Sequence, residues 1–118
     1  MSVLTITGDR QTGKSYTLAL LALDAALAGK SVFFACAGRT LATERFYEML
    51  ARCELFGLYE KAWRAKGEQR IKLRNGSMIW FGTPADRGHQ TQVRILDDVP
   101  DHPDLYFGAE RVIRSELS

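Results

Sequence analysis

The spacing of hydrophobic residues changes along the chain, and each spacing predicts a different secondary structure. Residues 2–7, SVLTIT, form a β-branched apolar run that is typical of a short buried strand. Over residues 14–28 the apolar positions recur every three or four residues, and the many Ala and Leu favour a helix that stops at Gly29. Residues 31–36, SVFFAC, are continuously apolar, as in parallel strands buried on both faces. This order of elements predicts a right-handed βαβ unit.

The middle of the chain has a helical pattern. Thr40 is a suitable N-cap for a helix that runs to about Cys53, with Glu44 in its early turns, where a negative charge is favourable. A second helical stretch is predicted over residues 54–66, ending at Gly67.

The period of the hydrophobic residues then becomes two. The segments QRIKLR and SMIWFG flank Asn75-Gly76, a dipeptide strongly favoured in two-residue hairpin turns. A polar loop follows over residues 83–91, and residues 92–98, QVRILDD, read as an apolar strand that ends in two aspartates. The tail is predicted to be weakly helical around residues 109–117. Together these elements predict an α/β fold, mainly a parallel sheet with flanking helices and an inserted β-hairpin.

Composition limits the possibilities without naming a function. The 118 residues fit one domain, residues 1–118, and 46% hydrophobic and 25% charged residues are ordinary for a globular protein. The net charge of +2 is too small to indicate a partner, so any nucleic-acid surface must come from local clustering of basic residues.

The cysteines and the longest apolar stretch point away from secretion and from membranes. Cys36 and Cys53 lie in apolar surroundings, which is typical of buried thiols, and the two histidines lack metal-ligand spacing. Residues 18–28 are too short to span a bilayer, and the N-terminus shows no secretory signal pattern. We therefore expect a cytoplasmic protein with no membrane partner.

The most specific motif follows the first strand. Residues 8–15, GDRQTGKS, match the phosphate-binding loop G-x-x-x-x-G-K-[ST], between a strand and a helix as that loop requires. Its glycines let the backbone N–H groups curl around a phosphate, and the helix N-terminus adds partial positive charge. Lys14 would reach the β and γ phosphates, and the Ser15 hydroxyl would bind Mg²⁺. The predicted nucleotide-binding set is Gly8, Asp9, Arg10, Gln11, Thr12, Gly13, Lys14, Ser15 and Tyr16.

A phosphate-binding loop needs an acidic partner at the end of another strand. Asp97 and Asp98 end the strand VRILDD, so Asp97 would hold Mg²⁺ and Asp98 would orient the attacking water. The alternative is an ordinary acidic turn, since carboxylates are common in turns.

The motif and its surroundings resemble the ATPase domain of the large terminase subunit of tailed bacteriophages, a P-loop NTPase that packages DNA. The resemblance lies in Arg10 within the loop, in ALLALDAALAGKSVFFACAG, in the hairpin IKLRNGSMIWFGTP, in Arg87-Gly88 and in the acidic strand end. It covers most of residues 3–101 and implies ATP and Mg²⁺ as ligands, and the host cytoplasm as location. It also implies that Arg10 neutralises charge on the γ phosphate, so that the catalytic set is Arg10, Lys14, Asp97 and Asp98.

The sequence departs from that family at several points. The family carries an adenine-packing segment upstream of the first strand, and a glutamate at the position of Asp98. No nuclease domain follows, and no later strand with a polar tip is predicted after Asp101. A sheet with few strands buries little surface, so a homo-oligomer or a partner subunit is expected to complete it.

A cluster of basic residues gives a second candidate surface, a track for the backbone of double-stranded DNA. The alternative is a solvated helix face beside the polar side of a hairpin. The residues are Lys61, Arg64, Lys66, Arg70, Lys72 and Arg74.

We therefore expect a minimal terminase-like, Mg²⁺-dependent ATPase. The main alternative is a nucleotide-binding regulatory or assembly module with weak or no hydrolysis, favoured by Asp98 in place of glutamate. A small-molecule kinase is less favoured, because no arginine-rich lid is visible.

Overall fold

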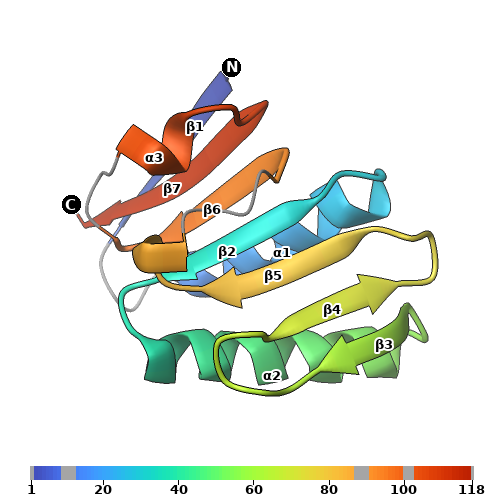
Figure 1. Cartoon of the computed structure of the whole chain (residues 1–118). Coiled ribbons are helices and arrows are strands. Elements are labelled where there is room, and N and C mark those ends of the chain that lie inside the picture. The colour runs from blue at the N-terminus through green and yellow to red at the C-terminus, as the bar shows by residue number, and fades with distance from the viewer. Residues whose placement is uncertain (1, 9–12, 87–90, 100–102, 118) are drawn as a thin grey trace.

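The fold is built on one seven-stranded sheet with the strand order β1-β7-β6-β2-β5-β4-β3 (Figure 1). A computed structural model describes residues 2–8, 13–86, 91–99 and 103–117 of the chain. In chain order the elements are β1 (Ser2–Gly8), α1 (Lys14–Leu27), β2 (Val32–Cys36), α2 (Arg39–Leu55), β3 (Tyr59–Trp63), β4 (Arg70–Leu73), β5 (Met78–Gly82), β6 (Val93–Asp97), α3 (Pro103–Tyr106) and β7 (Arg111–Leu117).

Most strand pairs in the sheet are parallel. β1 pairs with β7, β7 with β6, β6 with β2 and β2 with β5, all in parallel. The remaining pairs, β5 with β4 and β4 with β3, are antiparallel. The predicted α/β class, the mainly parallel sheet and the hairpin are thus confirmed. Because parallel strands end at the same edge of a sheet, the residues that follow β2 and β6 meet at that edge, beside the start of α1.

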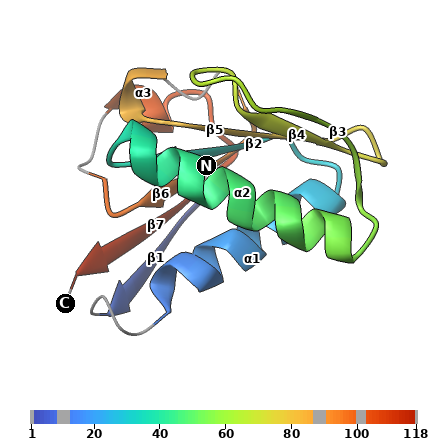
Figure 2. The ribbon, with the colours of Figure 1, turned by 90° about the horizontal axis from the view of Figure 1, so that it is seen from below.

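Helices cover the two faces of the sheet unequally. α1 and α2 lie on one face, where Leu18 and Phe46 pack into the larger hydrophobic core with Phe34 of β2 (Figure 2). The short α3 lies on the other face, where Leu105 packs against Phe33. In the described part of the chain, no helix has the length and apolar character needed to cross a membrane.

The predicted helix around residues 109–117 is wrong, because this segment forms β7. β7 is inserted between β1 and β6 and pairs in parallel with both. Val112 and Ile113 lie on opposite faces of the sheet, each in a different hydrophobic core. Glu, Arg and Leu in this segment favour a helix locally, but burial between two strands overrides that propensity.

The predicted helix over residues 54–66 is also wrong. α2 continues to Leu55, and Gly57 with φ +65° then turns the chain into β3. Ala62 of β3 packs against the core on the α2 side of the sheet. The start of α2 differs slightly as well, since the N-cap is Gly38 and Thr40 lies within the helix.

β1 was expected to be buried, but it is an edge strand. It pairs on one side only, with β7, and Val3 and Leu4 remain 50% and 38% exposed. By contrast, every residue of β2 is buried, as its continuous apolar sequence predicts. The apolar residues therefore identified both strands but could not distinguish the edge of the sheet from its centre.

The hairpin turn is anchored to the far end of α1. The Leu73 N–H donates to the Ser77 carbonyl and the Gly76 N–H donates to the Leu73 carbonyl, so the loop has three residues, 74–76, and Gly76 with φ +92° takes its left-handed position. The side-chain amide of Asn75 donates to the carbonyl oxygens of Ala26, at 2.9 Å, and Leu27, at 3.4 Å. Asn75 thus adds a side-chain donor to the last carbonyl groups of α1, of which Ala26 also accepts from the Gly29 N–H.

Candidate functional site

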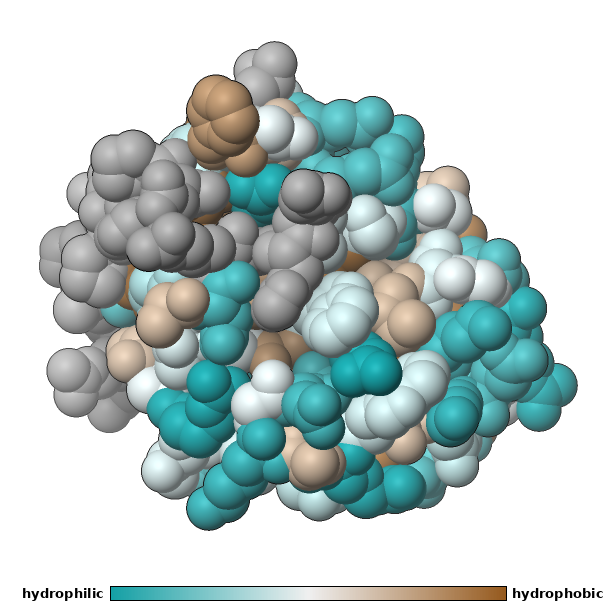
Figure 3. Space-filling view, in the orientation of Figure 1, coloured by the Kyte–Doolittle hydropathy of each residue, from teal (hydrophilic) through white to brown (hydrophobic). Residues whose placement is uncertain are grey.

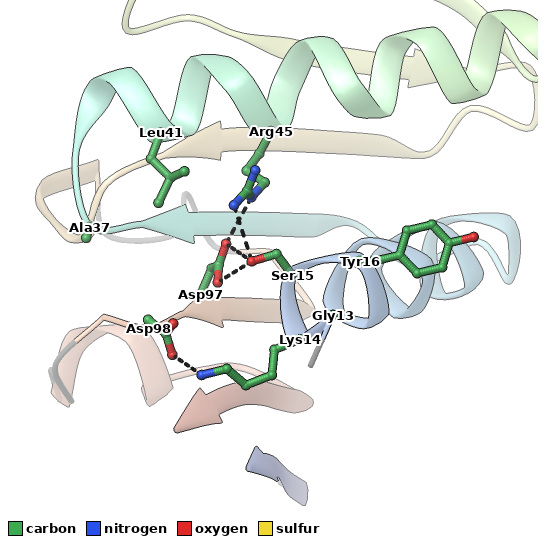
Figure 4. Close-up of a pocket in the computed structure, with 9 residues that line it drawn as sticks. All are labelled: Gly13, Lys14, Ser15, Tyr16, Ala37, Leu41, Arg45, Asp97 and Asp98. Atoms are coloured by element: carbon green, nitrogen blue, oxygen red, sulfur yellow. Dashed lines mark hydrogen bonds and ion pairs between the residues drawn. The ribbon is translucent and has the colours of Figure 1, made fainter. Parts of the chain in front are cut away.

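A pocket of about 550 Å³ lies at the carboxyl edge of the parallel strands (Figure 4). Open α/β sheets commonly bind ligands at this edge. The residues that line it come from the start of α1, from the segment after β2, from α2 and from the end of β6. They are Gly13, Lys14, Ser15, Tyr16, Ala37, Leu41, Arg45, Asp97 and Asp98.

The N-terminus of α1 points its partial positive charge toward this pocket. Gly13 is the N-cap, and its φ of +76° is a conformation that glycine adopts at little cost. The first N–H groups of a helix have no partner within the helix, so they favour an anion at this place. This end of α1 is therefore suited to an anion such as a phosphate.

Lys14 and Asp98 form one ion pair in the pocket. The Nζ atom of Lys14 lies 3.0 Å from Oδ1 of Asp98, and Lys14 is only 5% exposed. Asp98 has φ +53°, the single positive value among the described non-glycine residues. Ser115 of β7 stabilises this conformation: its hydroxyl accepts from the Asp98 N–H at 2.7 Å and donates to Oδ1 at 2.8 Å.

Asp97 forms the second acidic centre. Its carboxylate is buried, and both of its oxygens accept from the Ser15 hydroxyl at 3.2 Å. The Nε atom of Arg45 donates to Oδ2 of Asp97 at 3.1 Å, and Nη2 of Arg45 donates to Oγ of Ser15 at 3.2 Å. Figure 4 shows the guanidinium group above both side chains.

The surroundings of Arg45 reinforce its charge. Its Nη1 atom also donates to Glu48, at 3.0 Å. Burial alone would lower the pKa of the guanidinium, but the hydrogen bond to Asp97 and the charges of Glu48 and Asp97 outweigh it, so the pKa is raised. Arg45 is therefore a permanent cation held against the buried acid.

Asp97 also affects a neighbouring thiol. Cys36, the last residue of β2, lies beside Asp97 in the register of β2 and β6. Burial, with a further contribution from the negative charge of Asp97, raises the pKa of Cys36 to about 12. The thiol is therefore protonated at neutral pH and is a poor nucleophile.

Ser15 and Asp97 supply the donor set for a divalent cation. Hydroxyl and carboxylate oxygens suit Mg²⁺, which usually takes few protein ligands and fills its coordination with water and phosphate oxygens. No group of three or more His, Cys, Asp or Glu side chains able to hold a metal occurs in the described ranges. In this structure a cation of the chain, Arg45, contacts oxygen atoms of both Asp97 and Ser15.

The structure brings part of the predicted site close together. Lys14 and Ser15 lie against Asp98 and Asp97, although more than 80 residues separate them in sequence. Gly8 ends β1, whereas Asp9, Arg10, Gln11 and Thr12 lie outside the described residues, as do Arg87 and Gly88. Tyr16 lines the pocket, but its side chain points away from the acids (Figure 4). The residue is 58% exposed, and its ring centroid lies 4.9 Å from the Arg52 guanidinium.

Two residues of the site, Ser115 and Arg45, were not predicted from the sequence. The prediction that no strand with a polar tip follows Asp101 was wrong, because Ser115 lies in β7 and contacts Asp98. Its signal was hidden by the helical appearance of the tail. Arg45 could have been suspected, since α2 follows β2 directly and Arg45 lies one turn after Leu41, on the side of the helix that reaches the carboxyl edge.

The predicted basic track lies on strands and turns rather than on a helix face. Trp63, Arg70 and Trp80 are directly paired across β3, β4 and β5, and the Arg70 guanidinium lies 4.1 and 4.7 Å from the two ring centroids. Lys61 and Lys72 form the next paired row, and Lys72 is ion-paired with Glu60. Figure 3 shows mainly hydrophilic residues over this part of the sheet.

Comparisons with protein-family models, with curated proteins and with solved structures found no match to this chain.

Proposed function

We propose that this chain is a P-loop NTPase domain that binds and hydrolyses ATP with Mg²⁺. The observation that carries the proposal is the meeting of Lys14 and Ser15 with Asp98 and Asp97 in one pocket. A lysine, a hydroxyl and two carboxylates, beside a helix N-terminus, are the groups that phosphoryl transfer from a nucleotide requires.

Each side chain has a defined task in this proposal. Lys14 exchanges its ion pair with Asp98 for the β and γ phosphates, which places it next to the bond that breaks. Ser15 and Asp97 hold Mg²⁺, which when bound neutralises charge on the phosphate oxygens. Asp98, once released from Lys14, orients a water molecule in line with the γ phosphate, and Ser115 keeps its carboxylate in position.

The second candidate, a nucleotide-binding module with little hydrolysis, is favoured by Asp98 itself. Its side chain is one methylene shorter than glutamate, and its carboxylate is already held by Lys14 and Ser115. Both functions require the same nucleotide-binding pocket, so they differ only in turnover.

The DNA-packaging type is proposed on the sequence resemblance to terminases. Arg10 would act on the γ phosphate, and double-stranded DNA would contact the basic track on β3, β4 and the turns beside them. The exposed edge of β1 supports assembly with a second copy or a partner subunit, because an unpaired edge can accept another strand.

Turnover measurements test the proposal. We expect ATP hydrolysis that requires Mg²⁺, rises with added double-stranded DNA and is lost in Lys14→Ala. Tight nucleotide binding without turnover, unchanged by Asp98→Glu, would favour the binding module instead. If neither binding nor turnover is measurable at millimolar ATP and Mg²⁺, the proposed function is wrong.

A further inference from the structure

All three nitrogen atoms of the Arg45 guanidinium are engaged in the pocket. Nε donates to Asp97, Nη2 to Ser15 and Nη1 to Glu48, at 3.1, 3.2 and 3.0 Å. Asp97 and Ser15 are the two residues to which the proposed function assigns the divalent cation. The same oxygen atoms therefore have two candidate positive partners, one built into α2 and one taken from solution.

We propose that Arg45 is an exchangeable counter-ion, which competes with the divalent cation for Asp97 and Ser15 and gives way when metal and nucleotide bind together. This inference rests on the proposed function for the nucleotide, but the competition for Asp97 does not require one.

Because the Asp97 carboxylate is buried, it needs a positively charged partner at all times. Asp97 is 2% exposed, so an unpaired negative charge there would be strongly unfavourable. Some cation must stay in contact with the carboxylate in every state of the pocket. Arg45 donates both to Oδ2 of Asp97 and to Oγ of Ser15, so a metal ion that binds Oγ and Oδ2 takes the place of the guanidinium.

The structure also offers a place for Arg45 after displacement. Glu48 lies one turn further along α2 and is 53% exposed, so its carboxylate can keep the guanidinium at the outer side of the pocket. There it faces the nucleotide phosphates, which bring the negative charge that favours its release from Asp97.

Lys14 makes a similar exchange, from Asp98 to the phosphates. Both acids in the pocket are paired with a cation of the chain, Asp98 with Lys14 and Asp97 with Arg45. A triphosphate attracts the two side-chain cations, and a divalent cation compensates the acid that Arg45 leaves. Metal and nucleotide should therefore bind with positive coupling, and Arg45 should be one source of it.

The test is a titration with Mn²⁺, followed by electron paramagnetic resonance, on the intact chain with and without a non-hydrolysable ATP analogue. Without nucleotide, Arg45→Ala should bind Mn²⁺ about ten- to a hundredfold more tightly than the unmodified chain, because one charge-assisted contact to Asp97 is removed. With the analogue, the difference between the two should shrink to a few-fold.

Matched variants assign the effect to this position. Arg39→Ala removes another arginine of α2, one that pairs with Asp86, and should leave Mn²⁺ affinity unchanged. Arg45→Gln keeps a hydrogen-bond donor for Asp97 without the charge, so it should behave like Arg45→Ala while preserving the fold. The double variant Arg45→Gln with Asp97→Asn should lose the tighter site, which locates the metal at Asp97.

One result would overturn the role proposed for Arg45. If folded Arg45→Gln binds Mn²⁺ no more tightly than the unmodified chain without nucleotide, Arg45 does not compete with the metal. Failure of the analogue to bind any variant would instead refute the proposed nucleotide function. The comparison with Mn²⁺ alone would still decide the role of Arg45.

Discussion

The parallel and antiparallel parts of the sheet present their candidate functional residues in different ways. In the parallel part, the strand ends bring Lys14, Ser15, Asp97 and Asp98 from opposite ends of the sequence into one pocket. In the antiparallel part, β3 and β4 spread their basic residues over a face. The residues of the pocket share partners and should depend on one another, whereas those of the basic face should act nearly independently.

The largest contrast is expected between two ion-paired lysines. Lys14→Ala should weaken binding of a fluorescent ATP analogue by about a hundredfold or more, because a charged contact to phosphate in an enclosed pocket is lost. Lys72→Ala, which removes a lysine paired with Glu60 on the basic face, should leave this affinity unchanged. Equal losses in the two variants would contradict the assignment of the phosphate site.

The second-largest contrast is expected in the free energy of unfolding. Asp97→Ala should lower the free energy of unfolding by about 2 kcal/mol in urea titrations, because Arg45 and Ser15 lose their shared acceptor in a largely buried place. Glu60→Ala, which breaks the exposed pair with Lys72, should change it by less than about 0.5 kcal/mol. A neutral Asp97→Ala would mean that the Arg45 contact contributes nothing to the fold.

The two thiols give a smaller contrast. Burial raises the pKa of Cys36 to about 12 and that of Cys53 to about 11, from an ordinary value of 9.0. Both should resist alkylation at pH 8, and Cys36 should hold about tenfold less thiolate, since one pH unit separates the values. Mass spectrometry of the alkylated peptides measures both rates, and Asp97→Asn should narrow the gap because the Asp97 carboxylate contributes only to the Cys36 value.

The same thiols predict how stability depends on pH. Each folded pKa lies above that of the unfolded thiol, so the unfolded chain releases these protons first as pH rises. Their contribution to stability is complete below about pH 9 and is lost as the pH rises through about 11 and 12. Cys36→Ala should flatten this alkaline decline in thermal melting temperature, and an unchanged decline would refute the buried-thiol assignment.

The smallest effects are expected on the basic face. Lys72→Glu combined with Arg74→Glu should weaken double-stranded DNA binding and reduce its dependence on salt, while ATP affinity changes by no more than about twofold. Fluorescence anisotropy at several salt concentrations measures the slope. DNA binding that is unaltered by both substitutions would remove this face from the proposed function.

The parts that could be predicted from the sequence share a local origin. The helix that starts at Lys14, the hairpin at Asn75-Gly76 and the fully buried β2 are each specified by adjacent residues, and all lie where expected. The pairing of Ser15 with Asp97 was also anticipated, because an acid at the end of a parallel strand must reach the common carboxyl edge.

The parts that could not be predicted depend on distant partners. β7 has the helix-favouring residues Glu, Arg and Leu, and becomes a strand because β1 and β6 leave a place between them. The role of Ser115 follows from that insertion alone. The position of Arg45 early in the helix after β2 indicates that it lies near the carboxyl edge, but nothing in the sequence identifies Asp97, 52 positions away, as its partner.

The side-chain amide of Asn75 has a mechanical consequence. α1 is fixed at both ends, at Lys14 by Asp98 and at Ala26 by the turn between β4 and β5. A helix of 14 residues is a stiff rod about 21 Å long. A displacement of the hairpin should therefore be passed along α1 to Lys14, so that a partner bound at the hairpin would be coupled to the pocket through this helix.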